Sequence, residues 1–204
     1  MRMNKSQVLL CACLLGSSSQ VFAQLIARPS TGTAVDASAG NDTLQLYYDT
    51  PAPMRDVPSD LDYGLLLSKE RDVIASAAFM IHSAIQPLPR LSLRVGPQAY
   101  LAKLDSGNTD LLALAAGASA SFDLIRSLGI VVFGDAFYAP GVLLFGDANR
   151  MSDFSAGASV RFAPRLYGTA GYRWLRFSLT KAPSERVQNE LFVGLRWVPN
   201  GGGP

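Results

Sequence analysis

Residues 152–163 read SDFSAGASVRFA, and this stretch decides the fold class. Its apolar side chains fall on one face of an extended chain, while the alternate positions are small, polar or charged. The apolar face consists of Phe154, Ala156, Ala158, Val160 and Phe162. Residues 187–198 repeat the pattern near the end of the chain. A period of two indicates β-strands whose two faces meet different surroundings.

The same alternation recurs along the chain between clusters of Gly, Pro, Asp and Asn, and it predicts nine strands. They lie at residues 42–50, 60–69, 73–83, 90–104, 110–122, 128–139, 152–163, 166–180 and 187–198. Bacterial single-chain barrels have even strand numbers, so either one of the nine predicted strands is wrong or one strand is missing. Either Thr33–Ala39 adds a tenth strand, which we slightly favour, or residues 42–50 lie outside the wall and eight remain.

The N-terminal residues 1–23 predict a cleaved signal peptide, with basic Arg2 and Lys5, an apolar core and Ala23 at the cleavage site. The apolar core is too short to span a bilayer, which takes roughly 20 residues. Lipidation of Cys13 is the alternative. Residues 24–41 are expected to form a flexible lead-in with room for an extra strand, followed by a barrel at 42–198 and a C-terminal tail at 199–204.

Composition excludes several function classes. The 204 residues carry 18 Lys plus Arg against 16 Asp plus Glu, and both surplus charges lie in the leader. An electroneutral mature chain offers no basic surface for nucleic acid. A single His in the chain leaves little material for acid–base or metal chemistry.

Alternation alone does not separate a soluble sandwich from a membrane barrel, but connections and aromatic residues favour the barrel. Short links at 122–128 and 162–166 contrast with a long loop at 139–152, as in barrels with periplasmic turns and outer loops. With short links in the periplasm, outward aromatic residues form two girdles. The lower girdle is Tyr63, Phe122, Phe162 and Trp197, and the upper girdle is Tyr138, Phe154, Tyr172 and Trp174.

Three runs resemble the YfaZ family of small outer-membrane proteins. They are Gly134–Pro140 (GDAFYAP), Ala170–Leu175 (AGYRWL) and Phe192–Trp197 (FVGLRW), and the resemblance extends from about Asp42 to Val198. It implies a small outer-membrane barrel, often described as porin-like, with no established substrate. We therefore expect an all-β, transmembrane, antiparallel up-and-down β-barrel of 8 or 10 strands after a cleaved signal peptide.

With the apolar face outward, charged side chains point into the lumen. We predict a charge network of Arg94, Asp135, Asp153, Arg161, Arg173, Glu190 and Arg196, with Gln98 also facing inward. Asp135, Asp153, Arg173 and Glu190 are expected in the upper half, and Arg173 and Glu190 are expected to pair directly. The network either lines a selective passage or fills a narrow interior, and the second alternative is favoured because few strands enclose little space.

The expected function is porin-like passage of small solutes or a structural membrane role, and the alternative is a plugged barrel that binds a partner or surface. The apolar run Val142–Phe145 suggests a lid or an adhesive patch. His82 and Ser83 are adjacent and face opposite sides of a strand, so no enzyme is expected. We expect no cofactor or metal and a monomer in outer-membrane lipid. Barrel-assembly machinery and periplasmic chaperones are the expected partners, and nucleic acid is not.

Overall fold

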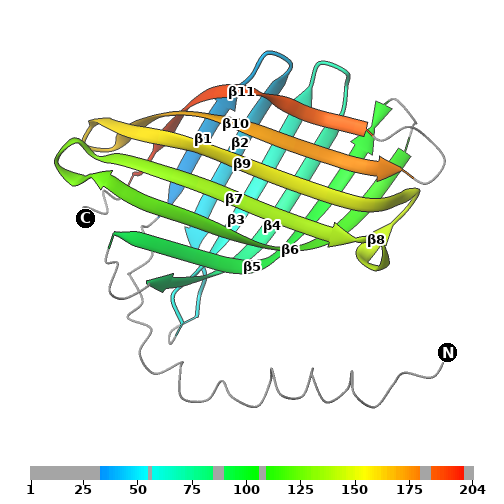
Figure 1. The fold of residues 1–204 in the computed structure, drawn as a ribbon, viewed down its shortest axis with the longest axis horizontal. Helices are drawn as coiled ribbons and strands as arrows, with labels where there is room; N and C mark the ends of the chain where they lie inside the picture. Colours follow the sequence, from blue (N-terminus) through cyan, green and yellow to red (C-terminus); the bar gives the residue numbers. More distant parts are fainter. Residues whose placement is uncertain (1–32, 55–56, 85–89, 106–108, 180–184, 200–204) are drawn as a thin grey trace.

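A computed structural model describes residues 33–54, 57–84, 90–105, 109–179 and 185–199. The predicted signal peptide and most of the C-terminal tail lie outside these residues. Eleven strands are present in the described part (Figure 1). They are β1 (Ala34–Ala39), β2 (Thr43–Pro51), β3 (Ser59–Ser68), β4 (Val73–Ala84), β5 (Leu91–Leu104), β6 (Thr109–Ile125), β7 (Ile130–Pro140), β8 (Leu144–Phe145), β9 (Ala148–Ala163), β10 (Leu166–Leu179) and β11 (Glu185–Trp197).

Ten of these strands close into an antiparallel barrel, in which β5 pairs with β6 and β1 pairs with β11. The predicted tenth strand is confirmed, because β1 lies between β2 and β11 and completes the ring. The wall therefore begins at Ala34 rather than at residue 42. Two-residue β8 stands outside the ring order and pairs only with β6, opposite Leu112 and Ala113.

Because neighbouring strands are antiparallel, β1 begins and β11 ends at the same end of the barrel, here called the near end. The strand pairs β2–β3, β4–β5, β6–β7 and β9–β10 are connected at this end. The far end carries the other connections. The loop expected at 139–152 is shorter than predicted, because β7 continues to Pro140 and β9 begins at Ala148. Only residues 141–147 connect the two strands, and they contain the 3-10 helix η4 (Gly141–Leu143) and β8. None of the described residues form a helix that is long and apolar enough to cross a membrane.

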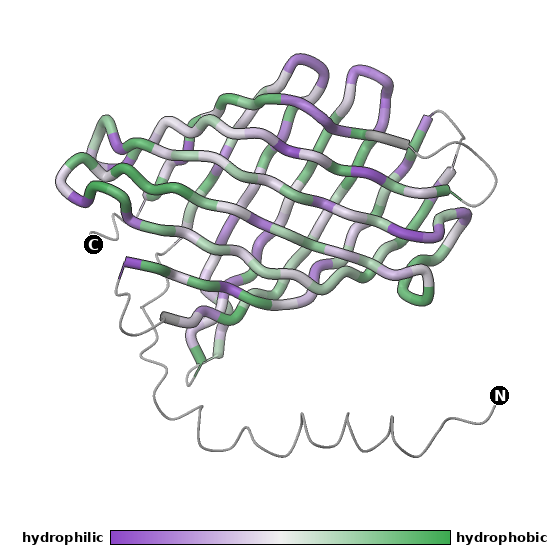
Figure 2. Tube along the Cα trace, in the orientation of Figure 1, coloured by the Kyte–Doolittle hydropathy of each residue, from purple (hydrophilic) through white to green (hydrophobic). Residues whose placement is uncertain are grey.

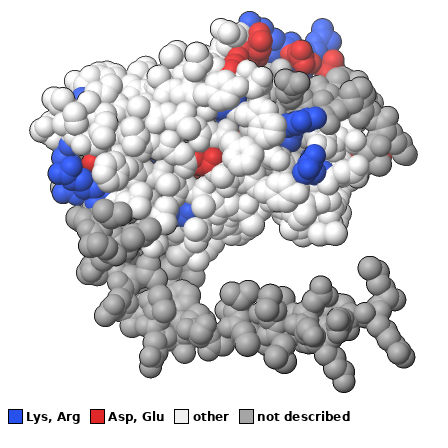
Figure 3. All heavy atoms as spheres, viewed as in Figure 1, with Lys and Arg blue, Asp and Glu red and all other residues white. Residues whose placement is uncertain are grey.

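The outer face of the wall is apolar. On β11, for example, Leu191 is 72% and Val193 65% exposed. Figure 2 shows apolar and polar residues interleaved along the strands, and Figure 3 shows that charged atoms gather mainly toward the ends of the visible wall. Large exposed apolar areas of this kind need covering by something other than water, and a bilayer supplies it.

Inward glycines let the wall curve closely around its contents. Gly171 on β10 and Gly157 on β9 are register partners. A Cβ atom at Gly171 would stand 2.6 Å from the Ala156 carbonyl oxygen and 2.7 Å from Cζ of Phe192 on β11. Similarly, Phe133 of β7 covers Gly157, where a Cβ would stand 2.8 Å from the ring. Aromatic rings over bare backbone fill the inside of a strongly curved sheet.

Candidate functional site: the barrel lumen

The middle of the lumen is crossed by a buried ion pair between Arg173 of β10 and Asp153 of β9. Arg173 Nε donates to Asp153 Oδ1 at 2.9 Å and Nη2 donates to Oδ2 at 2.5 Å, which makes the contact bidentate. The two side chains are only 7% and 6% exposed. Two tyrosines complete the group, because Arg173 Nη1 donates to the Tyr47 hydroxyl at 2.5 Å and Tyr100 donates to Asp153 Oδ2 at 2.9 Å.

These four side chains come from β2, from β5 and from the paired strands β9 and β10, which are three separate parts of the ring. The guanidinium of Arg173 also lies over the Tyr47 ring, 5.8 Å from its centroid. A buried ion pair is tolerated when hydrogen bonds satisfy its remaining atoms, as the tyrosines do here. The group therefore ties distant parts of the wall together across the lumen.

Between the Arg173–Asp153 group and the far end, the lumen is filled by a packed apolar core, here called the apolar layer. Four of its large side chains are fully buried, with 0% exposure, and they are Leu104, Met151, Leu175 and Phe177. Leu144 of β8 joins the same cluster and packs inward from the 141–147 connection. The run Val142–Phe145 is thus divided, because Leu144 is buried whereas Val142 is 85% exposed.

The expected direct pair between Arg173 and Glu190 is wrong. The two residues are register partners on β10 and β11. Arg173 instead reaches diagonally to Asp153 of β9, whose direct register partner on β10 is Leu175. Long side chains span such diagonal offsets. Glu190 instead accepts hydrogen bonds from the Thr43 hydroxyl and from the Asp42 amide at 2.9 Å, beside the turn between β1 and β2.

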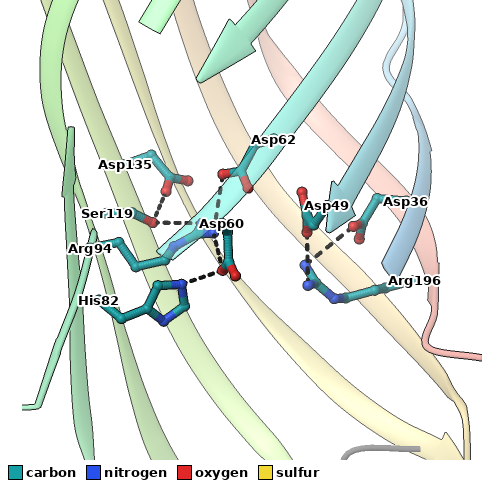
Figure 4. Close-up of polar contacts among 9 residues, drawn as sticks. All are labelled: Asp36, Asp49, Asp60, Asp62, His82, Arg94, Ser119, Asp135 and Arg196. Carbon is teal, nitrogen blue, oxygen red and sulfur yellow. Dashed lines mark hydrogen bonds and ion pairs between the residues drawn. The ribbon is translucent and has the colours of Figure 1, made fainter. Parts of the chain in front are cut away.

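The near half of the lumen contains a second polar cluster around Arg94 of β5 (Figure 4). Arg94 Nη1 lies 3.1 Å from Asp62 Oδ2 and 3.8 Å from Asp60 Oδ2, while Nη2 donates to Ser119 Oγ at 3.2 Å. Asp60 also contacts His82 Nε2. The cluster joins side chains from β3, β4, β5 and β6.

Asp135 of β7, which the sequence predicts in the upper half, is connected to this near cluster by hydrogen bonds. Its carboxylate accepts hydrogen bonds from Ser119 and, at 2.7 Å, from Ser155. Ser119 therefore links Asp135 to Arg94. In the register, Asp135 stands opposite Ser155 of β9, as Arg173 of β10 does, so it lies between the Arg94 cluster and the Arg173 group.

A third group holds Arg196 near the end of β11, where Nη1 lies 3.2 Å from Asp36 and Nη2 lies 2.9 Å from Asp49 (Figure 4). Together the two near groups contain more carboxylates than guanidinium groups, and their members are Asp36, Asp49, Asp60, Asp62, Asp135, Arg94 and Arg196. No cluster of His, Cys, Asp or Glu in the described residues could hold a metal ion.

The two remaining inward predictions lie apart from these groups. Gln98 is buried on β5. The Arg161 amide donates to the Gly129 carbonyl at 3.2 Å, which places Arg161 beside the near-end turn between β6 and β7. Sequence reasoning missed Tyr47, Tyr100 and the aspartates on β1, β2 and β3. The alternation Asp60, Leu61, Asp62, Tyr63 indicates the two aspartates of β3, because Asp62 is adjacent to an outward Tyr63 and therefore faces inward, and Asp60 shares its face.

All eight aromatic residues of the predicted girdles lie on the outer side of their strands. Phe122 and Trp174 are half-buried, and the other six are exposed. Trp174 is covered by Phe154, whose ring stacks on it with 5.6 Å between centroids. Tyr48 was missed, and it stacks on Tyr63 at 6.4 Å. Whether the two sets mark membrane interfaces stays a prediction.

A closed antiparallel barrel with an even number of strands, an apolar outer face and charged side chains inside defines a transmembrane β-barrel of the outer-membrane type. The chain belongs to the YfaZ family, because the model of that family, described as YfaZ precursor, matches residues 68–197. This confirms the resemblance seen in the sequence.

Among curated proteins, no sequence matches this chain. Among solved structures, it is similar to a "Bacterial polysaccharide outer membrane secretin", with a TM-score of 0.47 and 13% sequence identity. The similarity covers 78% of this chain and 56% of that chain, so the chain spans little more than half of the solved structure's length.

Proposed function

We propose that the protein is an outer-membrane barrel with a structural role, whose lumen is closed to solutes. The single observation that carries this proposal is the apolar layer in the far half, where Leu104, Leu175 and Phe177 are inaccessible to water. Ten strands enclose little more than the space that side chains fill in small barrels. A passage would require this layer to part.

The polar groups support the same role. Arg173 and Asp153 satisfy each other with the two tyrosines, and Arg94 and Arg196 each contact carboxylates. Selective pores are lined by rings of charged side chains that can interact with a passing solute. Charged side chains that bind each other, as here, are less available for such an interaction. We also propose that the protein has no catalytic role, because His82 contacts Asp60 and its neighbour Ser83 falls on the opposite side of β4.

Recording in planar bilayers tests the closed lumen. The refolded protein, whose folding is checked by heat-modifiable gel mobility, should give no unitary current. The variant Leu104→Ala/Phe177→Ala, which removes two members of the layer, should conduct. A uniform conductance from the wild type would establish porin-like passage instead. Fractionation with the outer membrane tests location, and release with periplasmic contents after osmotic shock would contradict it.

A second candidate function, binding of a partner at the cell surface, is favoured by the exposed apolar side chains of Val142 and Phe145 at the far end. The variant Val142→Ser/Phe145→Ser removes this apolar surface and leaves the buried Leu144 in place. Loss of cell-surface or partner adhesion in this variant, with unchanged folding, would support the binding role. Unchanged adhesion would exclude these side chains from it.

A further inference from the structure

A shallow apolar groove runs over β6, β7, β9 and β10 on the outer face of the wall, with a volume of about 530 Å³. Its floor is formed by small residues, including Ala118, Gly134, Ala136 and Ala156, and the stacked rings of Phe154 and Trp174 border it. Asp135 and Ser155 also border the groove, but their side chains bind each other on the lumen side. The groove is therefore an apolar channel with small side chains below and aromatic side chains beside it.

Two arginines lie beyond the aromatic border on the same face. Arg176 follows Trp174 by two positions on β10 and alternates with buried Leu175 and Phe177. Arg150 precedes Phe154 by four positions on β9 and comes just before buried Met151. In the register between β9 and β10, Arg150 stands opposite Ser178 and Arg176 opposite Ser152, so the two arginines are close neighbours. Figure 3 shows basic atoms on this face, toward the end at which β8 lies.

Neither arginine forms an ion pair with a carboxylate among the described residues, and the buried Nε of Arg176 has no hydrogen-bond partner there. Two other basic residues at the far end, Lys69 and Lys103, face acidic ones. Lys69 lies 3.1 Å from Asp42, and Lys103 stands opposite Asp110 in the register of β5 and β6. The charge of Arg150 and Arg176 is thus available to an external anion at the edge of an apolar groove.

We propose that the groove binds one phosphorylated glycolipid of the lipid A class, with an acyl chain along the small residues and a phosphate held by Arg150 and Arg176. Guanidinium groups bind phosphate oxygens in a bidentate manner, and neighbouring basic side chains select anionic lipids. The inference rests on the proposed location, because an outer-membrane barrel with its termini in the periplasm turns its far end to the outer leaflet. Lipid A supplies phosphate groups in that leaflet.

The test is native mass spectrometry of the refolded protein in neutral detergent with added lipid A. The variant Arg150→Gln/Arg176→Gln should bind lipid A roughly tenfold more weakly than the wild type. The matched control, Lys69→Gln/Lys103→Gln, removes the same charge from the same end and should bind as the wild type does. Equal affinity of the arginine variant and the wild type overturns the site, and so does equal affinity of the wild type for phosphatidylglycerol.

The groove itself is tested by Ala136→Leu/Ala156→Leu, which fills it without touching the arginines. This variant should bind severalfold more weakly, whereas Ala77→Leu, on the exposed face of β4, should not change binding. Heat-modifiable mobility and insertion into vesicles are measured on every protein. A wild type that does not insert overturns the proposed function, while an inserted wild type with undiminished binding in the arginine variant overturns the lipid site alone.

Discussion

Phe192 on β11 lies over Gly171 on β10, its direct register partner, so closely that a Cβ atom at Gly171 would stand 2.7 Å from the ring. The same arrangement joins Phe133 to Gly157 and Phe137 to Gly117. In each case the ring occupies the space that a side chain would need. The curvature of the wall and the filling of the lumen therefore depend on the same pairs.

Replacing Gly171 with Ala should destabilise the barrel, because the added methyl group would also stand 2.6 Å from the Ala156 carbonyl oxygen. Overpacking of this kind costs about 1–3 kcal/mol. Gly134→Ala is the control, since a Cβ there would meet its nearest atom at 3.6 Å. Urea unfolding in lipid vesicles measures both variants. Equal stability of the two would show that Phe192 moves aside without cost.

Replacing Arg173 with Ala should lower stability strongly, because Asp153 would remain buried without its counter-charge. Removing one partner of a buried ion pair costs about 3–5 kcal/mol. The exposed pair of Lys69 and Asp42 supplies the control, and Lys69→Ala should cost at most about 1 kcal/mol. Thermal unfolding followed by heat-modifiable mobility measures both. Unchanged stability of Arg173→Ala would contradict the role of the pair in tying the wall together.

The sequence predicted most of the wall but only part of its contents. Alternation located the long strands, whereas β1 has six residues in a stretch rich in Ser, Thr, Ala and Gly, and its membership depended on ring closure. Alternation also placed Arg173 and Asp153 inside. It could not choose Asp153 over Glu190 as the partner, because that choice depends on strand stagger and diagonal side-chain reach.

Removing side chains from the apolar layer should lower the stability of the barrel as well as open its lumen. Phe177→Ala removes a fully buried ring and should cost about 3–5 kcal/mol, since large core cavities do not collapse completely. Phe162→Ala, at a position on the outer face that is 58% exposed, is the matched control and should cost much less. Urea unfolding in vesicles distinguishes the two. Similar costs for both substitutions would mean that the far half of the lumen is not packed as a core.

Breaking β1 should prevent closure of the ring. Ala37 stands at the centre of β1, opposite Leu195 of β11 and Leu46 of β2, so proline there removes an amide donor between two strands and fixes a backbone angle. Ala37→Pro should therefore yield protein without heat-modifiable mobility and with increased sensitivity to protease. Val142→Pro, at an exposed position in the 141–147 connection, controls for proline itself. If Ala37→Pro folds as well as this control, the remaining strands close without β1, and the ten-stranded ring is not what stabilises the barrel.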